Sequence, residues 1–275
     1  PKNNSFKVVN QFIVEDLHTR IPDMLIFING IPVGIFEFKS AIEEGKTVHD
    51  AWEQITIRYA RDIPSLLKYT SLSVICDGAN TRLGTIFTPY QFYYSWNKAN
   101  EKDTVSNGIS SLFTMIEGVF AKDRILQILR DFIFYPDDSK KQEAIICRYP
   151  QFFAANKMLA NIQRHKKPKG DGKGGIYFGA TGCGKTYIML FLARLLMLRD
   201  RDRFHNPTIV LITDREDLDT QASKLFVTAK KYLHDENVRS IETREDLHDT
   251  LTNRESGGVY ICLLYTSDAA DDLIG

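Results

Sequence analysis

Three charged residues flank two apolar runs that an Asn-Gly pair separates. Residues 22–40 read PDMLIFINGIPVGIFEFKS, in which Asp23 precedes the first run and Glu37 and Lys39 close the second. Carboxylate oxygens are ligands that Mg²⁺ prefers, and an ammonium group can stabilise charge that develops on a phosphate. The three residues are therefore candidates for a metal-dependent nuclease site. Charged ends of a solvent-exposed hairpin would give the same pattern, so this segment alone leaves both alternatives open.

The Asn29-Gly30 pair predicts a β-hairpin turn between the two runs. Glu37 and Lys39 stand two positions apart on a strand, so they share one face of the sheet. A two-residue loop would put Asp23 and Glu37 on opposite faces, whereas a three-residue loop would put them on the same face. The nuclease interpretation therefore predicts an odd-length loop, and a two-residue turn without a bulge would count heavily against it.

A second candidate site lies at residues 179–186, GATGCGKT, which match the pattern G-x-x-x-x-G-K-[ST]. Glycines allow such a loop to point its backbone N–H groups at phosphates, the lysine neutralises phosphate charge, and the threonine hydroxyl binds Mg²⁺. A glycine turn between a strand and a helix is the alternative. The candidate nucleotide-binding residues are Gly179, Thr181, Gly182, Cys183, Gly184, Lys185 and Thr186, with Cys183 interpreted as a small filler and not as a redox switch.

The elements around these sites predict two α/β parts. In the first 100 residues we expect a strand or short helix at 6–14, the hairpin, a helix over 47–69 broken at Pro64, and strands at 71–76 and 82–87. Apolar helical sequence follows at 110–135. After a helix at 151–163 and a basic, glycine-rich run at 164–175, the predicted strands at 175–179, 207–213, 238–243 and 258–262 alternate with helices. This alternation predicts a parallel sheet with helices on its faces, with Thr213, Asp214 and Arg215 at the ligand-binding edge.

Composition narrows the function classes. Lys and Arg number 35, as do Asp and Glu, so nucleic-acid binding must rest on local basic patches and not on an overall basic field. The four scattered cysteines lack zinc-ligand spacing and fit a reducing cytoplasm. No signal peptide or apolar run of membrane-spanning length is present, which predicts a cytoplasmic protein without membrane contact.

The order of several segments now resembles a known family. The hairpin, RDIPSLL at 61–67, DGANTRLGT at 77–85 and the phosphate loop behind a linker resemble the restriction (R) subunit of type I restriction–modification enzymes. The resemblance implies a PD-(D/E)xK nuclease domain followed by a superfamily 2 helicase-type motor. It also implies ATP-driven translocation along double-stranded DNA, cleavage of unmodified DNA, and methylase and specificity subunits as partners. The recognition sequence would be read by those partners and not by this chain.

Residue roles follow from the same resemblance. Asp23 and Glu37 would hold Mg²⁺ and Lys39 would be catalytic, while Lys185 and Thr186 would serve ATP and its Mg²⁺. Gln151, in YPQFFAANK, would read adenine, although a polar residue at a helix start is an equal alternative.

One position departs from the family pattern. The family carries Gln-x-x-x-Tyr on the helix after Glu-x-Lys, but here Gln54 is followed by Tyr59, five residues on. In an α-helix this step separates two side chains by about 140°, and Arg58 would occupy the stacked place. Either the helix carries a one-residue bulge or Tyr59 is not the partner of Gln54.

The end of the sequence departs further. No strand after the phosphate loop ends in the D-E-x-x pattern that would place the ATP metal, and residues from about 262 resemble a translated sequencing adapter. We therefore expect a nuclease-like domain at 1–100, a helical connector at 101–148, part of a helicase ATP-binding domain at 149–261 and a non-native tail at 262–275. A stand-alone superfamily 2 helicase without nuclease activity and an inert nucleotide-binding fragment are the competing interpretations.

Overall fold

The computed structural model describes residues 1–40, 47–137, 142–213, 216–253 and 256–263. The chain divides into two compact units. The first unit comprises residues 1–133 and 141–150, and the second comprises residues 134–140 and 151–275.

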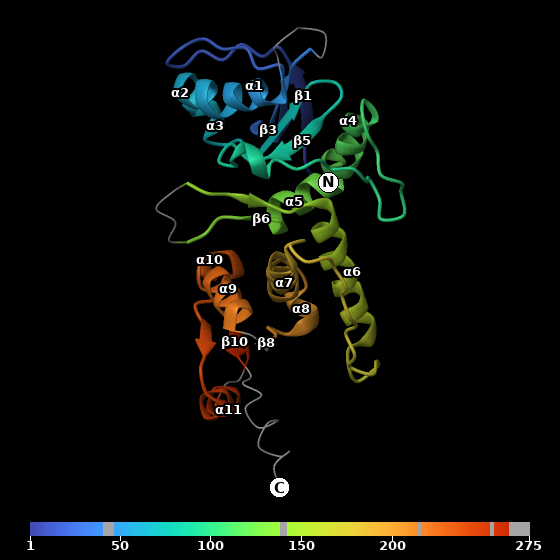
Figure 1. Ribbon diagram of the computed structural model, residues 1–275, viewed down its shortest axis with the longest axis vertical. Coiled ribbons are helices and arrows are strands. Elements are labelled where there is room, and N and C mark those ends of the chain that lie inside the picture. The colour runs from blue at the N-terminus through green and yellow to red at the C-terminus, as the bar shows by residue number, and fades with distance from the viewer. Residues whose placement is uncertain (41–46, 138–141, 214–215, 254–255, 264–275) are drawn as a thin grey trace. The chain divides into compact units, whose positions relative to one another are not determined.

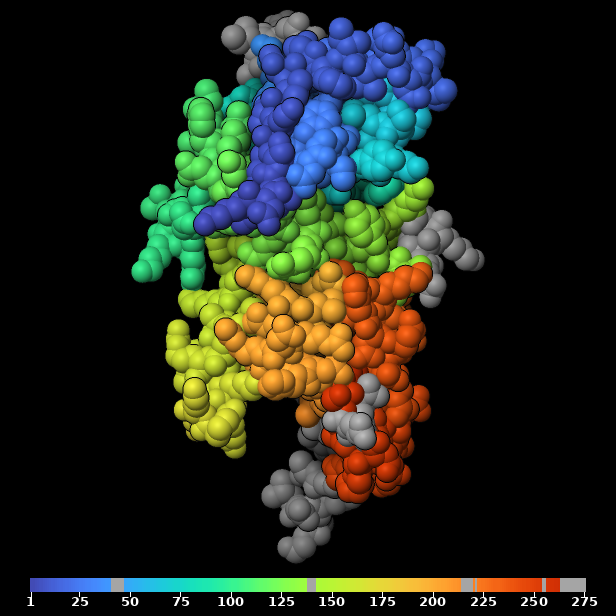
Figure 2. Space-filling model, turned by 180° about the vertical axis from the view of Figure 1, so that it is seen from behind, coloured from blue at the N-terminus to red at the C-terminus, as the bar shows by residue number. Residues whose placement is uncertain are grey.

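The first unit is built on a five-stranded mixed sheet with the order β1-β2-β3-β4-β5 (Figure 1). Its strands are β1 (Phe6–Asn10), β2 (Met24–Ile28), β3 (Ile31–Phe38), β4 (Leu72–Cys76) and β5 (Thr81–Gly84). Only β3 and β4 run parallel; the other neighbours are antiparallel. The N-terminal segment, dark blue in Figure 2, runs along the surface as the edge strand β1. The predicted hairpin and the strand at 71–76 are confirmed, and the strand expected at 82–87 ends earlier, at Gly84.

One face of this sheet is covered by an irregular helix. It comprises α1 (Val48–Glu53), the π-helix η1 (Gln54–Tyr59), α2 (Ala60–Asp62) and α3 (Pro64–Leu67). The helix begins at a capping box, in which Thr47 Oγ1 accepts from the His49 N–H and the Asp50 carboxylate accepts from the Thr47 N–H. Its expected break at Pro64 is confirmed, since Ile63 leaves the helical conformation before the proline.

The helical face and the sheet bury a common apolar core, which includes Leu25, Ile35, Ile55, Ile63 and Ile75. The opposite face of β3 contacts a second helical segment, where the rings of Phe36 and Phe120 lie 4.9 Å apart. The further elements are η2 (Tyr90–Phe92), α4 (Ser110–Met115), the π-helix η3 (Ile116–Phe120) and α5 (Lys122–Asp131), with β6 (Ile133–Phe134) and β7 (Ile145–Ile146) forming a separate two-stranded sheet.

The second unit contains a three-stranded parallel sheet, as the alternation of strands and helices predicted. Its order is β8-β10-β9, from β8 (Ile209–Thr213), β9 (Val238–Ile241) and β10 (Val259–Leu263). The helices are α6 (Tyr149–His165), α7 (Lys185–Arg194), the π-helix η4 (Leu195–Arg199), α8 (Arg201–Phe204), α9 (Glu216–Val227), α10 (Lys230–Leu233) and α11 (Arg244–Thr252). Cys262, the first residue of the expected tail, belongs to β10, and residues 264–275 lie outside the described residues.

The strand predicted at 175–179 is wrong. The segment has no regular structure, and Ile176 and Phe178 are 99% and 96% exposed. An apolar extended segment becomes a strand only when a neighbour accepts and donates its backbone hydrogen bonds. Within the described ranges no strand pairs with this one, and Gly175 adopts a positive φ of 109° at its start.

All four cysteines are free thiols. No helix in the described part of the chain is long and apolar enough to cross a membrane.

Candidate functional site

The hairpin turn has two residues, so the odd-length loop predicted for it is wrong. Asn29 and Gly30 both have positive φ, 53° and 83°, which is the conformation of a type I′ turn. Ile28 is paired with Ile31 across this turn. Without any further irregularity, this register would separate Asp23 from Glu37.

A β-bulge in β3 restores the shared face. Phe27 pairs with Pro32, but Ile26 pairs with Gly34, which leaves Val33 as an extra residue in β3. A bulge of this kind inserts one residue on one strand and shifts the register beyond it. From there the pairing continues to Met24 and Phe36, so the next residues outward, Asp23 and Glu37, stand opposite each other. The alternative that would have argued against a nuclease site, a tight turn without a bulge, does not occur in this hairpin.

Glu37 and Lys39 form the centre of a polar cluster beneath the irregular helix. Lys39 Nζ donates to Glu37 Oε1 at 2.9 Å and to Gln54 Oε1 at 2.6 Å. The Glu37 side chain is 2% exposed and that of Lys39 is 13% exposed. The structure therefore brings three predicted site residues, Glu37, Lys39 and Gln54, into direct contact.

Tyr59 joins this cluster because the helix between Gln54 and Tyr59 is a π-helix. Gln54 Nε2 donates to the Tyr59 hydroxyl at 2.7 Å, and that hydroxyl donates to Glu37 Oε2 at 3.2 Å. In a π-helix the backbone bonds span five residues, so side chains five apart come together where an α-helix would turn them away. Arg58 is exposed and does not take the place of Tyr59. Of the two alternatives drawn from the sequence, the irregular helix is the one observed.

Asp23 lies directly before β2, next to the end of β3. Its Oδ2 accepts from the backbone N–H of Phe38 at 2.8 Å, and its Oδ1 accepts from Gln11 Nε2 at 3.3 Å. Gln11, which has a φ of 51°, was not predicted from the sequence, and no signal in its neighbourhood pointed to it. These bonds fix the direction of the carboxylate beside Glu37.

The electrostatics of the cluster keep Glu37 close to its titration point at neutral pH. Burial raises the pKa of Glu37 to about 7, and the charge of Asp23 adds to the rise, while the hydrogen bonds from Lys39 and Tyr59 oppose it. Burial and the Glu37 charge raise the pKa of Tyr59, so its hydroxyl remains a donor. Two carboxylates face one ammonium group, which leaves the site with an excess of negative charge that a cation would neutralise.

The donor set suits a hard cation with an open coordination sphere. In the described ranges no group of three or more His, Cys, Asp or Glu residues is gathered in metal-binding geometry. Asp23 and Glu37 therefore offer two carboxylates, and a divalent ion held there would keep most ligand positions for water and substrate oxygens. Mg²⁺ is commonly bound in this way, through one or two carboxylates.

The phosphate loop of the second unit precedes α7 directly. Gly182 and Gly184 adopt left-handed φ values of 77° and 78°, which only glycine takes without strain. Lys185 Nζ donates to the carbonyl oxygens of Gly179 and Ala180 at 2.6 and 2.9 Å. The Lys185 side chain thus folds back over the loop, and its ammonium group lies at the backbone of Gly179 and Ala180. Thr181 is exposed, and Thr186 follows Lys185 in the first turn of the helix.

Gln151 lies against the back of this loop. Its side chain is buried, and Nε2 lies 3.4 Å from the carbonyl oxygens of both Cys183 and Gly184. A Cβ added to Gly184 would come within 2.4 Å of the same nitrogen, so the glycine is needed for this approach. Three residues were predicted at the ligand-binding edge of the parallel sheet. Thr213 is the last residue of β8, whereas Asp214 and Arg215 lie outside the described residues.

Comparison with known proteins shows which families the two units resemble. Residues 1–92 match the family model described as the type I restriction enzyme R protein N terminus, and residues 150–270 match that of the SWI2/SNF2 ATPase. The chain belongs to the R proteins of type I restriction enzymes, as the resemblance implied.

The relatives named in these comparisons are endonuclease subunits. The type I restriction enzyme HindI endonuclease subunit of Haemophilus influenzae is 30% identical over 263 residues, which cover 94% of this chain and 24% of that protein. The putative type I restriction enzyme MjaIXP endonuclease subunit of Methanocaldococcus jannaschii is 31% identical over 268 residues, covering 89% of this chain and 25% of that protein. The chain thus spans about a quarter of the length of these relatives.

Proposed function

We propose that the first unit is a PD-(D/E)xK nuclease domain that cleaves unmodified double-stranded DNA with Mg²⁺. The observation that carries the proposal is the convergence of Asp23, Glu37, Lys39, Gln54 and Tyr59 at one end of strands β2 and β3 through the bulge and the π-helix. The bulge and the π-helix are two independent backbone irregularities, and both bring side chains into the same cluster. Charged residues that only mark the ends of a hairpin would need neither. Functional sites are where such irregularities concentrate.

In this proposal Asp23 and Glu37 hold Mg²⁺. Bound there, the ion supplies neutralisation of phosphodiester charge and activation of water for attack. Glu37 must be ionised to bind it, and Lys39 and Tyr59 both hydrogen-bond the ionised carboxylate. Asp23, whose carboxylate accepts from the Phe38 N–H, offers the second carboxylate beside it.

Lys39 is proposed as the catalytic cation. Its ammonium group donates to Glu37 and Gln54, which hold it beside the Glu37 carboxylate. An ammonium in that place stabilises the negative charge that develops on a phosphate oxygen as the P–O bond breaks. Gln54 and Tyr59 position Lys39 and Glu37 and are not assigned contact with substrate.

The second unit is proposed to bind ATP and its Mg²⁺ through the loop from Gly179 to Thr186. In the larger enzyme the unit would belong to a helicase-type motor that translocates double-stranded DNA, working in the cytoplasm with methylase and specificity subunits. The support for this part is the match to the SWI2/SNF2 ATPase model together with the loop geometry.

Cleavage of plasmid DNA in Mg²⁺ tests the nuclease proposal. We expect nicking or linearisation by the chain, a loss of about 100-fold or more in Glu37→Gln, and unchanged binding of a fluorescent ATP analogue by that variant. Glu117→Gln, an exposed carboxylate of the same unit, is the matched control. Equal cleavage by wild type and Glu37→Gln would show that the cluster is not the nuclease site.

A further inference from the structure

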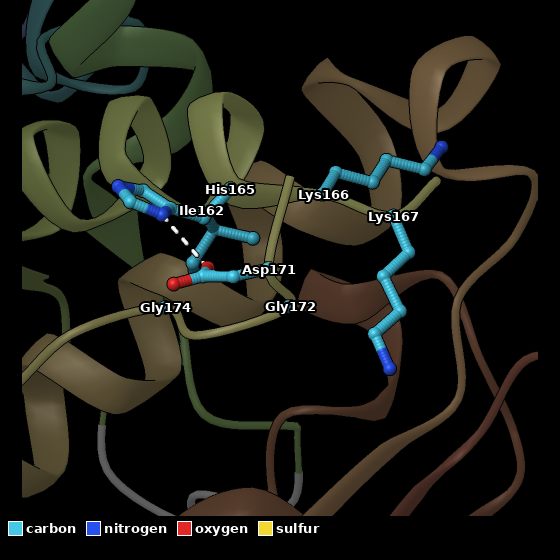
Figure 3. A pocket seen from close by; sticks show the side chains of 7 residues that line it. All are labelled: Ile162, His165, Lys166, Lys167, Asp171, Gly172 and Gly174. Atoms are coloured by element: carbon cyan, nitrogen blue, oxygen red, sulfur yellow. Dashed lines mark hydrogen bonds and ion pairs between the residues drawn. The ribbon is translucent and has the colours of Figure 1, made fainter. Parts of the chain in front are cut away.

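A cavity that neither proposed site uses lies in the second unit, where α6 ends. Figure 3 shows it at close range. It encloses about 520 Å³, which is ample for a phosphodiester group and its water. Its lining residues are Ile162, His165, Lys166, Lys167, Asp171, Gly172 and Gly174.

The loop that encloses the cavity is folded back on the helix by several hydrogen bonds. The Gly172 N–H donates to the His165 carbonyl at 2.7 Å, and Asn161 Nδ2 donates to the Gly174 carbonyl at 2.5 Å. Asp171 Oδ1 binds His165 Nδ1 at 2.8 Å and the Lys173 N–H at 2.9 Å. The loop therefore has a defined shape, and its one carboxylate is already engaged.

The charge of this loop is strongly one-sided. Residues 164–173, the basic loop, read RHKKPKGDGK and carry five Lys and Arg residues against one Asp, in a chain with no net charge. Lys167, Lys169 and Lys173 are exposed, and among described residues none of the three has a hydrogen-bond or ion-pair partner for its ammonium group. In Figure 3 Lys166 and Lys167 extend away from the His165–Asp171 pair.

A neighbouring segment adds further positive charge. Lys166 Nζ donates to the Arg203 carbonyl and lies 5.1 Å from the centre of the Phe204 ring, so the basic loop contacts α8. Arg201 and Arg203 of α8 are exposed, as is Asp202 between them, so α8 adds one net positive charge. Cations are favoured at a helix C-terminus by the macrodipole, which accounts for Arg164 and His165 in the last turn of α6. The macrodipole falls off within one turn, so it does not account for the lysines beyond the helix.

We infer that the basic loop is a contact surface for the phosphate backbone of duplex DNA. This inference rests on the proposed function, which supplies DNA as the substrate, and it names a surface that the nuclease site and the phosphate loop do not include. Unpaired lysines act as point charges toward phosphates and read no bases, which suits a protein that moves along DNA irrespective of sequence.

The salt dependence of DNA binding tests the inference. A fluorescent duplex of arbitrary sequence would be titrated with the whole chain at several KCl concentrations. Each lost phosphate contact lowers the slope of log K against log salt by about 0.9, so the triple variant Lys167→Gln, Lys169→Gln, Lys173→Gln should lower it by about 2 to 3. Affinity at low salt should fall by roughly tenfold or more. The control removes three exposed lysines elsewhere, with Lys102→Gln, Lys224→Gln and Lys231→Gln, and should leave the slope near that of wild type.

The outcomes separate this inference from the proposed function. Wild-type binding with an unchanged slope in the triple variant would overturn the inference alone. Equal losses in the triple variant and the control would also overturn it, because the effect would then reflect overall charge. Absence of wild-type binding would contradict both the inference and the DNA substrate of the proposed function.

Discussion

Gln54 and Tyr59 stand five residues apart on a helix, yet their side chains meet, with 2.7 Å between Gln54 Nε2 and the Tyr59 hydroxyl oxygen. The π-helix that spans them makes this contact and delivers the same hydroxyl to Glu37. One irregular turn thus connects the residue that holds Lys39 with the residue that stabilises the Glu37 carboxylate.

Tyr59→Phe should shift the pH dependence of DNA cleavage. The phenolic hydrogen bond lowers the pKa of Glu37, so its removal raises that pKa above about 7 and reduces the ionised fraction at neutral pH. We expect cleavage at about pH 7 to fall by roughly tenfold and to recover at higher pH. Tyr69→Phe, which alters an exposed tyrosine, is the control. A uniform loss at every pH would instead indicate a purely structural role for Tyr59.

Glu37 should also make the stability of the metal-free first unit depend on pH. The carboxyl pKa is about 7 in the folded unit, compared with 4.5 for an ordinary glutamate. Between these values the folded state binds more protons than the unfolded state, so stability falls as pH rises from about 5 to about 8. The contribution is about 3 kcal/mol at most.

Urea unfolding in EDTA measures this effect. The chain has two tryptophans, Trp52 and Trp96, and both belong to the first unit, so their fluorescence reports that unit selectively. Glu37→Gln should remove the decline in stability with pH, whereas Glu117→Gln should retain it. Parallel pH profiles for wild type and Glu37→Gln would contradict the raised pKa.

Gln151→Ala should weaken ATP and GTP binding by a similar factor. In the structure Gln151 supports the carbonyl groups of Cys183 and Gly184, so its loss would loosen the loop for any nucleotide. We expect a decrease of roughly tenfold for both, measured by competition with a fluorescent analogue. A loss confined to ATP would show that Gln151 reads adenine, as the family resemblance implied.

Lys185→Ala should abolish nucleotide binding at concentrations that saturate the wild type. The ammonium group that now lies on the Gly179 and Ala180 carbonyls is the charge that would meet the β- and γ-phosphates. Lys224→Ala, at an exposed position of α9, is the control. We expect no hydrolysis of bound ATP by this chain, because in its sequence no predicted strand after the phosphate loop ends in the D-E-x-x pattern that would place the metal. Lys185-dependent turnover would contradict that expectation.

The hairpin of β2 and β3 shows how much of a structure local sequence patterns can predict. The Asn-Gly turn and both strands followed from residue types, but the bulge at Val33 did not. Residues 33–37 of β3 are buried on both faces, so apolar and polar positions do not alternate, and alternation is the signal from which register is read. For Tyr59 the spacing itself signalled an irregular helix, although it left two outcomes open.

In the phosphate loop, the local pattern was sufficient for the loop itself but not for the segment before it. The glycines and Lys185 were recognisable by spacing because the conformation of that loop is largely a local property of the chain. The extended segment before it was wrongly predicted as a strand, because a strand depends on a pairing partner that a local pattern does not reveal. Within the described ranges no partner pairs with residues 175–179.

Direct titration of Mg²⁺ tests the central claim, that Asp23 and Glu37 form a cation site. Calorimetry of the whole chain at about pH 8, where Glu37 is ionised, would compare wild type with two variants of the first unit, Glu37→Gln and Glu117→Gln. Lys185→Ala would be measured as well, because Mg²⁺ binding at the nucleotide loop could be a second source of heat. We predict binding by wild type, Glu117→Gln and Lys185→Ala, with affinity reduced by about tenfold or more in Glu37→Gln. Identical Mg²⁺ binding by wild type and Glu37→Gln would contradict the assignment.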